Sequence, residues 1–421
     1  MQPTGLKRRR IMSLGLLLGL AAMYFGYTKL QDFLQDPDTG VRDTRDLVLA
    51  TKVGSDGAKA VLLSPGGSEE LAPDATETST DKAPVWRPDG NRVFFLSDRN
   101  EGAYLIHRWN VAKKSVEVRS IGTRSVTGMY WGPFGETDTK EALITQAGFV
   151  LSYEPREGTT RQVLPPQMKS ANKDDEGGST DQFQMQYQNI GKAFRSAKWP
   201  SDRSVVYALM TTEDDRQVLV RQGLQPEKDQ TGELTLPRPQ VLVVGKRVDY
   251  DVSGDGKVVA CVLGFDFLNK DSIPEEFVKN GKIIKPYENA VIVFDFAGNA
   301  GAIPMAASKD PKSAFVSATF SPTGDQLLAI AGTWDGKSSF AGQAIVAAPV
   351  QANAQWQGVV QGNILEVAWH PSGQQMAFVQ RVSPTESAVY TLKVGSDQPN
   401  KLTSGGEYQS ISFSPQTEIP K

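Results

Sequence analysis

An all-β fold made of repeated units, preceded by one membrane-spanning helix, is the fold class that this sequence predicts. Three observations predict it: a phrase that recurs seven times, an apolar run of strand length after its copies, and an uncharged segment near the N-terminus. The chain has 421 residues, of which 39% are hydrophobic and 22% charged, an ordinary balance for a protein with a buried core. Its single cysteine excludes an internal disulfide.

The first element is the uncharged segment 11–28, which follows the basic cluster Lys7-Arg8-Arg9-Arg10. A helix of this length rises about 27 Å, close to the ~30 Å of a hydrocarbon layer. Flanking basic residues stay on the cytoplasmic side. We therefore expect a cytoplasmic tail (1–10), a single-pass signal-anchor helix (11–28) and a linker (29–45). The remainder would lie in the periplasm or outside the cell, held by the bacterial inner membrane.

A cleaved signal peptide is the alternative for this segment. Against cleavage, Ala21-Ala22 is followed by Met23-Tyr24-Phe25 rather than by a small-x-small site. Aromatic residues at this end suit the interface of a retained helix. The segment has no cysteine to make it a lipoprotein anchor.

The repeated phrase is the main evidence for the fold. It places small or β-branched residues before a large residue, then a turn of Pro-Asp-Gly type, as in Ala83-Pro84-Val85-Trp86-Arg87-Pro88-Asp89-Gly90. Pro and Gly supply the backbone angles of a tight turn between strands. The large residue is Trp86, Trp131, Trp199, Val252, Phe320, Trp369 and Phe413, so the spacings are 45, 68, 53, 68, 49 and 44.

A period near 45 with about four strands per unit is typical of a β-propeller. Seven phrases predict seven blades. The last phrase has too little chain after it for a blade, whereas strand-like runs over 46–72 precede the first phrase. We therefore expect a propeller over 46–421, closed by pairing of 46–72 with 408–414, which would hide the sheet edges.

The phrase resembles the TolB-type Pro-Asp propeller repeat over nearly all of 46–415. The best single match runs from Ala83 to Asn100 and includes Ser97-Asp98-Arg99. The resemblance implies the fold and a role in binding proteins, as for many such propellers in extracytoplasmic settings. The chain differs from TolB in its expected anchor and in lacking room for an α/β domain before the propeller.

Charge and composition exclude several functions. The formal net charge is −3, but the first 29 residues carry five basic side chains and no acid, which leaves −8 for the rest. An acidic body argues against nucleic-acid binding. There are two histidines, His107 and His370, which we expect to be a strand residue and a solvent-facing turn residue. Cys261, in an apolar run, is expected to be a buried, inert thiol.

No catalytic, metal or cofactor site is predicted. The sequence contains no Gly-x-Ser-x-Gly. The closest approach to a calcium loop begins at Asp249, but its twelfth position is Ala260 rather than a bidentate Glu. Acidic clusters such as 174–176 and 213–215 are interpreted as solvated turns.

Insertions into the repeat are the best guide to function, because long loops on a rigid scaffold usually carry binding. The residues that lengthen three of the spacings beyond the period of about 45 lie in 165–192, 223–239 and 266–289. The last is apolar, and we hypothesise that four of its residues dock on a neighbouring subunit: Phe277, Ile283, Ile284 and Tyr287. The alternative is that they fold back on their own blade. For 165–192, decoration without function is an equal alternative.

Together these features predict a non-enzymatic scaffold or structural subunit of a larger membrane complex, without cofactors. The alternative is a hydrolase or lyase with a site in the propeller channel. Such an enzyme should concentrate His, Arg and carboxylates on loops at one end of the channel, whereas the turns here carry mainly Pro, Gly, Ser and Asp. A small-ligand sensor is disfavoured by the ten-residue tail.

Overall fold

The computed structural model describes residues 42–417, except 77, 100–103, 120–125, 133–140, 147, 156, 167–177, 229–233, 270–272, 274, 297–300 and 338. The expected tail 1–10, the expected helix 11–28 and most of the linker 29–45 lie outside this range. Within it, no helix is both long and apolar enough to cross a membrane. Residues 43–421 make up one compact unit, and the fold below is that of this unit.

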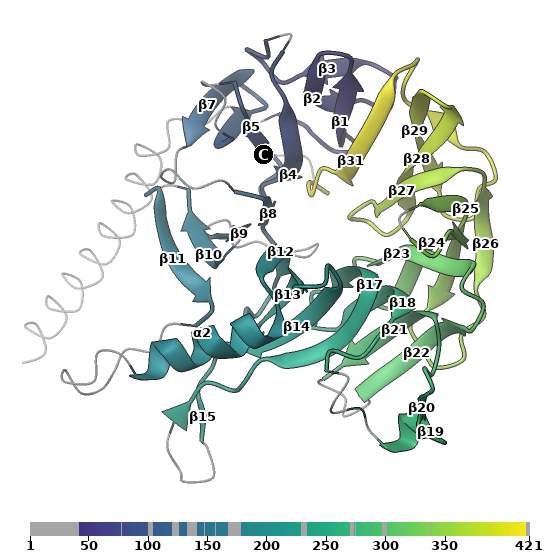
Figure 1. Ribbon diagram of the computed structural model, residues 1–421. Helices are drawn as coiled ribbons and strands as arrows, with labels where there is room; N and C mark the ends of the chain where they lie inside the picture. The colour runs from purple at the N-terminus through teal and green to yellow at the C-terminus, as the bar shows by residue number, and fades with distance from the viewer. Residues whose placement is uncertain are drawn as a thin grey trace, which may run out of the picture. The chain divides into compact units, whose positions relative to one another are not determined.

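Antiparallel sheets arranged around a central axis make up the unit (Figure 1). One sheet has the order β4-β5-β6-β7, with bounds Asp81–Trp86, Arg92–Ser97, Leu105–Asn110 and Ser115–Arg119. The next has the order β8-β9-β10-β11, with bounds Gly128–Tyr130, Ala142–Thr145, Val150–Glu154 and Thr159–Leu164.

A seven-stranded sheet follows, with the order β12-β13-β14-β17-β18-β21-β22. Its bounds are Ala193–Lys198, Val205–Thr211, Gln217–Gly223, Gln240–Val252, Val258–Phe265, Asn289–Asp295 and Gly301–Ser308. The long strand β17 pairs with β14 before Gly245 and with β18 after it. One continuous strand thus serves as the outer strand of one four-stranded unit and the inner strand of the next.

Two four-stranded sheets come next. The first is β23-β24-β25-β26, with bounds Ser313–Phe320, Gln326–Trp334, Phe340–Pro349 and Gln357–Gln361. The second is β27-β28-β29-β30, with bounds Ile364–Trp369, Gln375–Ser383, Glu386–Lys393 and Asn400–Lys401.

The last sheet joins the two ends of the unit. Its order is β3-β2-β1-β31, with bounds Glu69–Leu71, Gly57–Leu63, Val48–Gly54 and Glu407–Phe413. Val48 lies opposite Phe413 in this sheet, and Figure 1 shows purple β1 beside yellow β31. The Thr44 hydroxyl adds a hydrogen bond to the Gly90 carbonyl (2.8 Å) and lies 2.8 Å from the Ser414 hydroxyl. The N-terminal and C-terminal strands therefore share one sheet, and the ring has no open edge there.

Each phrase marks the end of an inner strand, the strand nearest the axis. The seven large residues end an inner strand or follow it directly, and all seven side chains are buried. Gly90 follows in a turn at φ 67°, where glycine is favoured, and its N–H donates to the Arg87 carbonyl. The indole of Trp199 donates to the carbonyl of Trp131, its counterpart one sheet earlier, at 3.1 Å. The phrase thus makes the turn within a sheet and, at Trp199, the contact between neighbouring sheets.

The core lies between neighbouring sheets. Strands β5 and β13 are buried along their whole length, because each is covered on both faces. One apolar cluster joins Leu49 and Leu62 of the closing sheet to Trp86 and Phe95 of the next sheet. Neighbouring sheets thus cover these near-continuous apolar strands on both faces.

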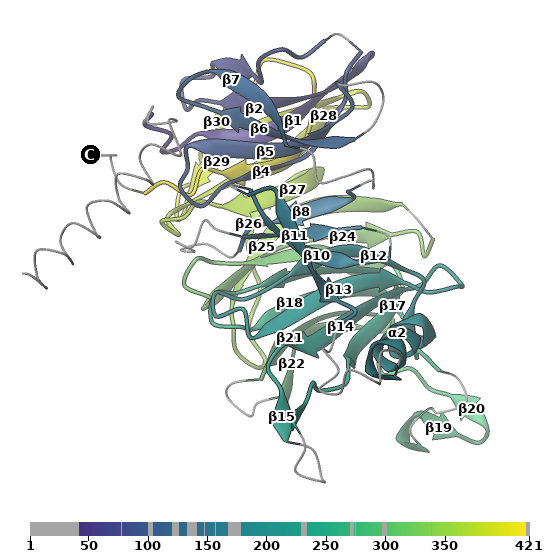
Figure 2. The same ribbon diagram turned by 90° about the vertical axis from the view of Figure 1, so that its left-hand side faces the viewer.

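The antiparallel order gives the unit two faces. Inner strands run toward the phrase turns, for example 87–91 and 370–374, and we call this end the phrase-turn face. The next strand runs back, so the turn 212–216 and the insertion 266–288 lie at the opposite end, the insertion face. The chain before β12 also lies there, and Figure 2 shows α2, β19 and β20 on the same side of the unit.

All three insertions contain secondary structure. The first contains α2 (Gly178–Ile190), whose Tyr187 and Ile190 pack into the core beside Phe194. The second contains a small hairpin of β15 (Glu227–Lys228) and β16 (Leu234–Thr235). The third contains a short 3-10 helix, η2 (Glu275–Phe277), and a hairpin of β19 (Val278–Lys279) and β20 (Lys282–Ile283).

Candidate functional site

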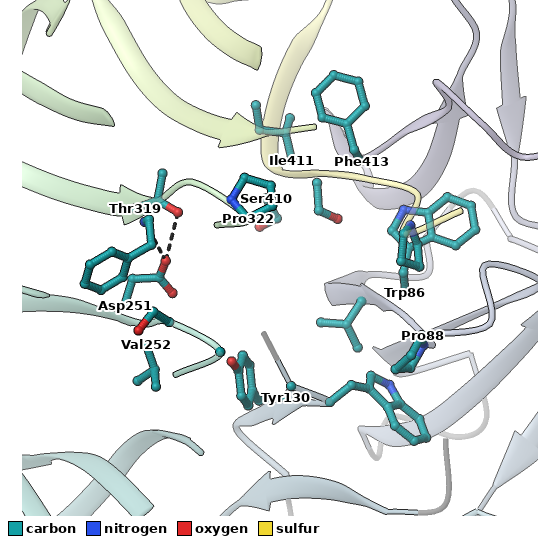
Figure 3. A pocket seen from close by; sticks show the side chains of 18 of the residues that line it. Trp86, Pro88, Tyr130, Asp251, Val252, Thr319, Pro322, Ser410, Ile411 and Phe413 are labelled. Atoms are coloured by element: carbon teal, nitrogen blue, oxygen red, sulfur yellow. Dashed lines mark hydrogen bonds between the residues drawn. The ribbon is translucent and has the colours of Figure 1, made fainter. Parts of the chain in front are cut away.

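A cavity of about 430 Å³ opens on the axis at the phrase-turn face. It is lined by the ends of five inner strands, β4, β8, β17, β23 and β31. In Figure 3, Trp86 and Pro88 lie on one side of it, and Asp251 and Thr319 on the other. Most lining side chains are apolar or carry a hydroxyl, and Asp251 is the one carboxylate among them.

The residue directly before the large residue of the phrase faces the axis in most sheets. In five of the seven phrases this residue lines the cavity, as in Val85, Tyr130, Asp251, Thr319 and Ser412. A strand places alternate side chains on opposite sides, so one position of the repeat yields one layer of the channel wall. The equivalent residue in β12 is Lys198, which faces Asp251 of β17, the next inner strand around the axis.

Asp251 has partners on both sides. Its Oδ1 lies 2.9 Å from Nζ of Lys198, and its Oδ2 accepts hydrogen bonds from the Thr319 hydroxyl (2.9 Å) and the Phe320 N–H (3.1 Å). Lys198 also donates to the Tyr250 carbonyl at 3.0 Å. The pair links three neighbouring inner strands, so Asp251 is held in place rather than free to act as a base.

A second layer of carboxyl groups lies two residues earlier in the repeat. Burial raises the pKa of Asp249 to about 6, with a further increase from the nearby Asp251 and an opposing effect of Lys198. The pKa of Glu366 is also raised by burial, although its carboxylate accepts the Ile411 N–H at 3.0 Å. Asp249 can therefore take up a proton near neutral pH.

These channel residues were not identified from the sequence. The signal was present, because aligning the seven phrases places Lys198 and Asp251 at one position, and Asp249 and Glu366 at another. The sequence interpretation considered the turns, where His, Arg and carboxylates are scarce, and not the inner strands.

Neither histidine takes part in the channel wall. His107 is buried in β6 and stacks on Phe95 at 5.5 Å between ring centroids. His370 is also buried, so the expectation of a solvent-facing turn residue is wrong. Phe413 packs edge-on against its ring at 4.8 Å, and Asp46 lies 3.2 Å from Nε2.

The surroundings of His370 superficially resemble a Ser-His-Asp arrangement, because the Ser372 hydroxyl lies 2.8 Å from Nδ1. The repeat explains this contact. In the equivalent turn of another sheet, the Ser321 hydroxyl lies 3.2 Å from Thr323, the residue that corresponds to Ser372. His370 thus closes its turn as the Ser321 hydroxyl does in another sheet.

Cys261 is buried at the centre of β18, opposite Asp249 in the register with β17. Burial raises the pKa of its thiol well above the ordinary value. A protonated, enclosed thiol is a poor nucleophile. This agrees with the expectation of an inert side chain. Among the described residues, no group of three His, Cys, Asp or Glu side chains is arranged to hold a metal ion.

The four predicted partner-binding residues divide into two pairs. Phe277 and Tyr287 belong to a chain of aromatic rings that leads back to the blade: Phe277 to Phe267 (5.4 Å), Phe267 to Phe265 (5.2 Å) and Phe265 to Tyr287 (4.7 Å). Ile283 and Ile284 stay 48% and 44% exposed. The structure thus brings the first pair onto their own blade and leaves the second pair on the surface.

Two further exposed apolar side chains occur on inserted segments. Val278, opposite Ile283 in the hairpin, is 42% exposed, and Met185 on α2 is 56% exposed. The sequence interpretation missed both. The exposure of Val278 depends on the register of the hairpin, and that of Met185 on which face of α2 contacts the core. Neither feature can be predicted from composition.

Comparisons with known proteins extend this description of the fold. The sequence matches no model of a protein family and no curated protein. Among solved structures, TolB from Acinetobacter baumannii is similar with a TM-score of 0.46 and 10% identity, covering 92% of this chain and 71% of that one. The propeller domain of the Trilobed protease from Pyrococcus furiosus gives 0.47 and 10%, covering 78% and 86%.

A putative 6-phosphogluconolactonase from Bacteroides fragilis gives a TM-score of 0.50 at 12% identity, covering 88% of this chain and 98% of that one. At such identities the likeness concerns the fold alone. The arrangement of the sheets about one axis and the phrase at the end of each inner strand show that the described residues form a β-propeller.

Proposed function

We propose that the protein is a membrane-anchored propeller that binds other proteins as a scaffold or structural subunit of a larger membrane complex. The propeller has seven blades, with the seven-stranded sheet counted as two. A signal-anchor helix over 11–28 holds it in the bacterial inner membrane, with the propeller on the extracytoplasmic side. It acts without a cofactor and has no catalytic residue.

One observation carries this proposal: two separate insertions, built on the same face, are fixed to the core and yet expose large apolar side chains. Tyr187 of α2 donates to the side chain of Gln222 at 3.0 Å, so this helix is attached to the propeller. Arg216 attaches the third insertion by donating to the Phe267 carbonyl at 2.6 Å. Rigid presentation of apolar side chains lowers the entropic cost of association.

The channel offers less support for catalysis. Its one lining carboxylate, Asp251, is paired with Lys198. Among the described residues that line the cavity there is no histidine or cysteine to act as a base or nucleophile. Binding at the insertion face therefore agrees better with the described side chains than chemistry in the channel does.

The test replaces residues 269–286 with Gly-Ser-Gly in the full chain, followed by purification in mild detergent. The ends of the insertion are kept because Asn289 is buried, accepts the Gly264 N–H at 3.1 Å and donates to three backbone carbonyls, at 310, 311 and 313. Removing Asn289 would damage the blade itself. We expect an intact propeller that no longer co-purifies with its partner.

The matched control replaces 227–235, the hairpin of β15 and β16 on the phrase-turn face, with the same linker. We expect this control variant to co-purify with the partner as the parent protein does. Unchanged co-purification after both replacements would place the contact elsewhere. Loss of the partner in both variants, with melting temperature unchanged, would contradict a specific role for the insertion face.

An enzyme in the channel is the second candidate, a hydrolase or lyase acting on sugars or peptides. The observation that favours it is Asp249, whose pKa of about 6 suits a general acid or base, two residues from a cavity of small-molecule size. Turnover of oligosaccharide or peptide substrates that is lost in Asp249→Asn would support it. Equal turnover in that variant would exclude Asp249 as the catalytic group.

A further inference from the structure

The hairpin of β19 and β20 is a tight, well-defined element. Val278 lies opposite Ile283, and Lys279 opposite Lys282. The two residues between them, Asn280 and Gly281, have φ values of 52° and 69°. Positive φ at both positions is the signature of a type I′ turn, whose twist matches that of the paired strands. The Ile284 N–H extends the pairing by donating to the Phe277 carbonyl at 2.8 Å.

The base of the hairpin is fixed to the propeller. The Arg216 guanidinium donates to the Leu268 carbonyl (3.3 Å) as well as to that of Phe267, and lies 3.3 Å from the Asp266 carboxylate. The chain of rings described above continues this attachment as far as Phe277. The direction of the tip is therefore set by the fold, and little ordering is left to be lost on binding.

The tip exposes apolar side chains on both of its faces. Because side chains alternate along a strand, Val278 and Ile283 share one face, and Ile284 lies on the other. All three are between 42% and 48% exposed. A partner that covers one flat face would leave part of this apolar surface in water, so an occupant must surround the hairpin.

Two like charges face each other at the end of the hairpin. Lys279 and Lys282 are opposite in the register and both exposed, and like charges in this position destabilise a strand pair. Among the described residues neither forms a salt bridge, whereas the third lysine, Lys285, lies 3.8 Å from Glu288. Glu275 and Glu276 lie at the base of the hairpin, so the positive charge is confined to its tip, where it favours a negatively charged occupant.

The order of the residues decides between occupants. A lipid surface is disfavoured, because the polar turn and both lysines would have to pass the headgroups before the isoleucines reached apolar depth. The cavity of a second copy is disfavoured too, because its carboxylate, Asp251, is already paired with Lys198. A cleft in a different protein accommodates both features.

We propose that the hairpin inserts tip-first into a cleft of a partner protein other than this chain. The walls of the cleft are apolar and contact Val278, Ile283 and Ile284. Its floor carries carboxylates that pair with Lys279 and Lys282. This inference rests on the proposed binding function and adds to it the site and chemistry of the contact.

The test places a photo-crosslinking benzophenone amino acid at position 283 of the full chain, in native membranes. A second variant carries it at position 185 on α2, the other exposed apolar site on the insertion face. We expect position 283 to crosslink to one partner protein, at a peptide that contains Asp or Glu. The charge change Lys279→Glu with Lys282→Glu should lower the crosslink yield at 283 by about tenfold or more, as for loss of paired interface charges.

A matched variant, Lys393→Glu with Lys401→Glu, makes the same change at two exposed lysines of another blade and should leave the yield unchanged. Crosslinks to lipid or to a second copy would overturn the inference, as would a yield at 283 that ignores the charge of Lys279 and Lys282. If 185 captures a protein and 283 does not, the inference fails and the binding function stands. If neither position crosslinks, both fail.

Discussion

Asp249 and Asp251 lie two residues apart on β17. Of these two carboxylates, only Asp251 lies within ion-pair distance of a described cation, the Lys198 ammonium at 2.9 Å. Asp249 is half-buried and has no such partner, and its desolvation raises its pKa to about 6. The two carboxyl groups of one strand therefore make opposite contributions to stability at neutral pH. Asp251 holds three inner strands together, and ionised Asp249 weakens the same region.

Asp249→Asn should stabilise the propeller at alkaline pH. Because the folded-state pKa of Asp249 lies above the ordinary value of about 3.9, its contribution to the free energy of unfolding is favourable and complete below pH 4. This contribution is lost as pH rises through 6. At pH 8 the ionised group costs up to about 3 kcal/mol, from a shift of about 2 pKa units. We expect the melting temperature of the variant to exceed that of the parent by a few degrees at pH 8 and to equal it at pH 4.

Asp251→Asn is the control, and its effect should have the opposite sign. The amide cannot neutralise Lys198, and the Thr319 hydroxyl and the Phe320 N–H lose a charged acceptor, so about 1–3 kcal/mol should be lost at pH 8. If both variants lower the melting temperature at pH 8 by similar amounts, the assignment of Asp249 as the unfavourable carboxylate is incorrect.

His370 should make ring closure sensitive to acid. Burial lowers its pKa, although Asp46 opposes the effect. Because the folded-state pKa of His370 is lowered, its contribution to the free energy of unfolding is complete above the ordinary value of about 6.5 and is lost as pH falls below that value through the folded-state pKa. The difference in melting temperature between pH 8 and pH 5 should be smaller in His370→Gln than in the parent. An identical difference in the two proteins would show that His370 does not titrate on unfolding.

The parts of the fold that follow from the sequence are those that depend on local chemistry. A large residue before a Pro-Asp-Gly turn has the same effect wherever it occurs, so Trp86 and Phe320 could be assigned to equivalent places from the sequence alone. The strand-like runs within 46–72 and 408–414 were likewise visible as incomplete blades. The structure pairs Leu49 with Ser412, within these ranges.

The parts that do not follow depend on contacts between blades. Lys198 and Asp251 are 53 positions apart and meet only because their inner strands are neighbours in the ring. His370 was expected to face solvent, but Asp46 packs over it from 324 positions earlier. Tyr287 and Ile284 are both large apolar residues of one insertion, and the sequence does not show which of them is packed. In the structure, Tyr287 packs against Phe265 and Ile284 is exposed. Contacts of this kind can be predicted only when the arrangement of the sheets in space is known.

The anchor hypothesis predicts that the protein is an integral membrane protein with segment 11–28 retained. An uncharged helix of this length should remain in the bilayer at high pH, whereas a protein held by partners alone is released. Carbonate washing of membranes should therefore leave the protein in the pellet. A mature N-terminus beyond Met23 would show that the segment is removed.

The last prediction concerns β31, the strand that completes the sheet β3-β2-β1-β31. Deleting 408–421 should open the ring and lower the free energy of unfolding by several kcal/mol. Tyr408 and Phe413 are each only 1% exposed, and burying one aromatic side chain of this size contributes about 1.5–3 kcal/mol. The deletion also removes the N–H partner of Glu366 and leaves β1 with an unpaired edge, a site for aggregation. Deleting only 418–421 is the control and should leave the melting temperature unchanged. A synthetic peptide spanning 407–417 should restore stability to the longer deletion by adding a strand to β1. If the longer deletion melts at the parent temperature, β31 does not hold the ring closed.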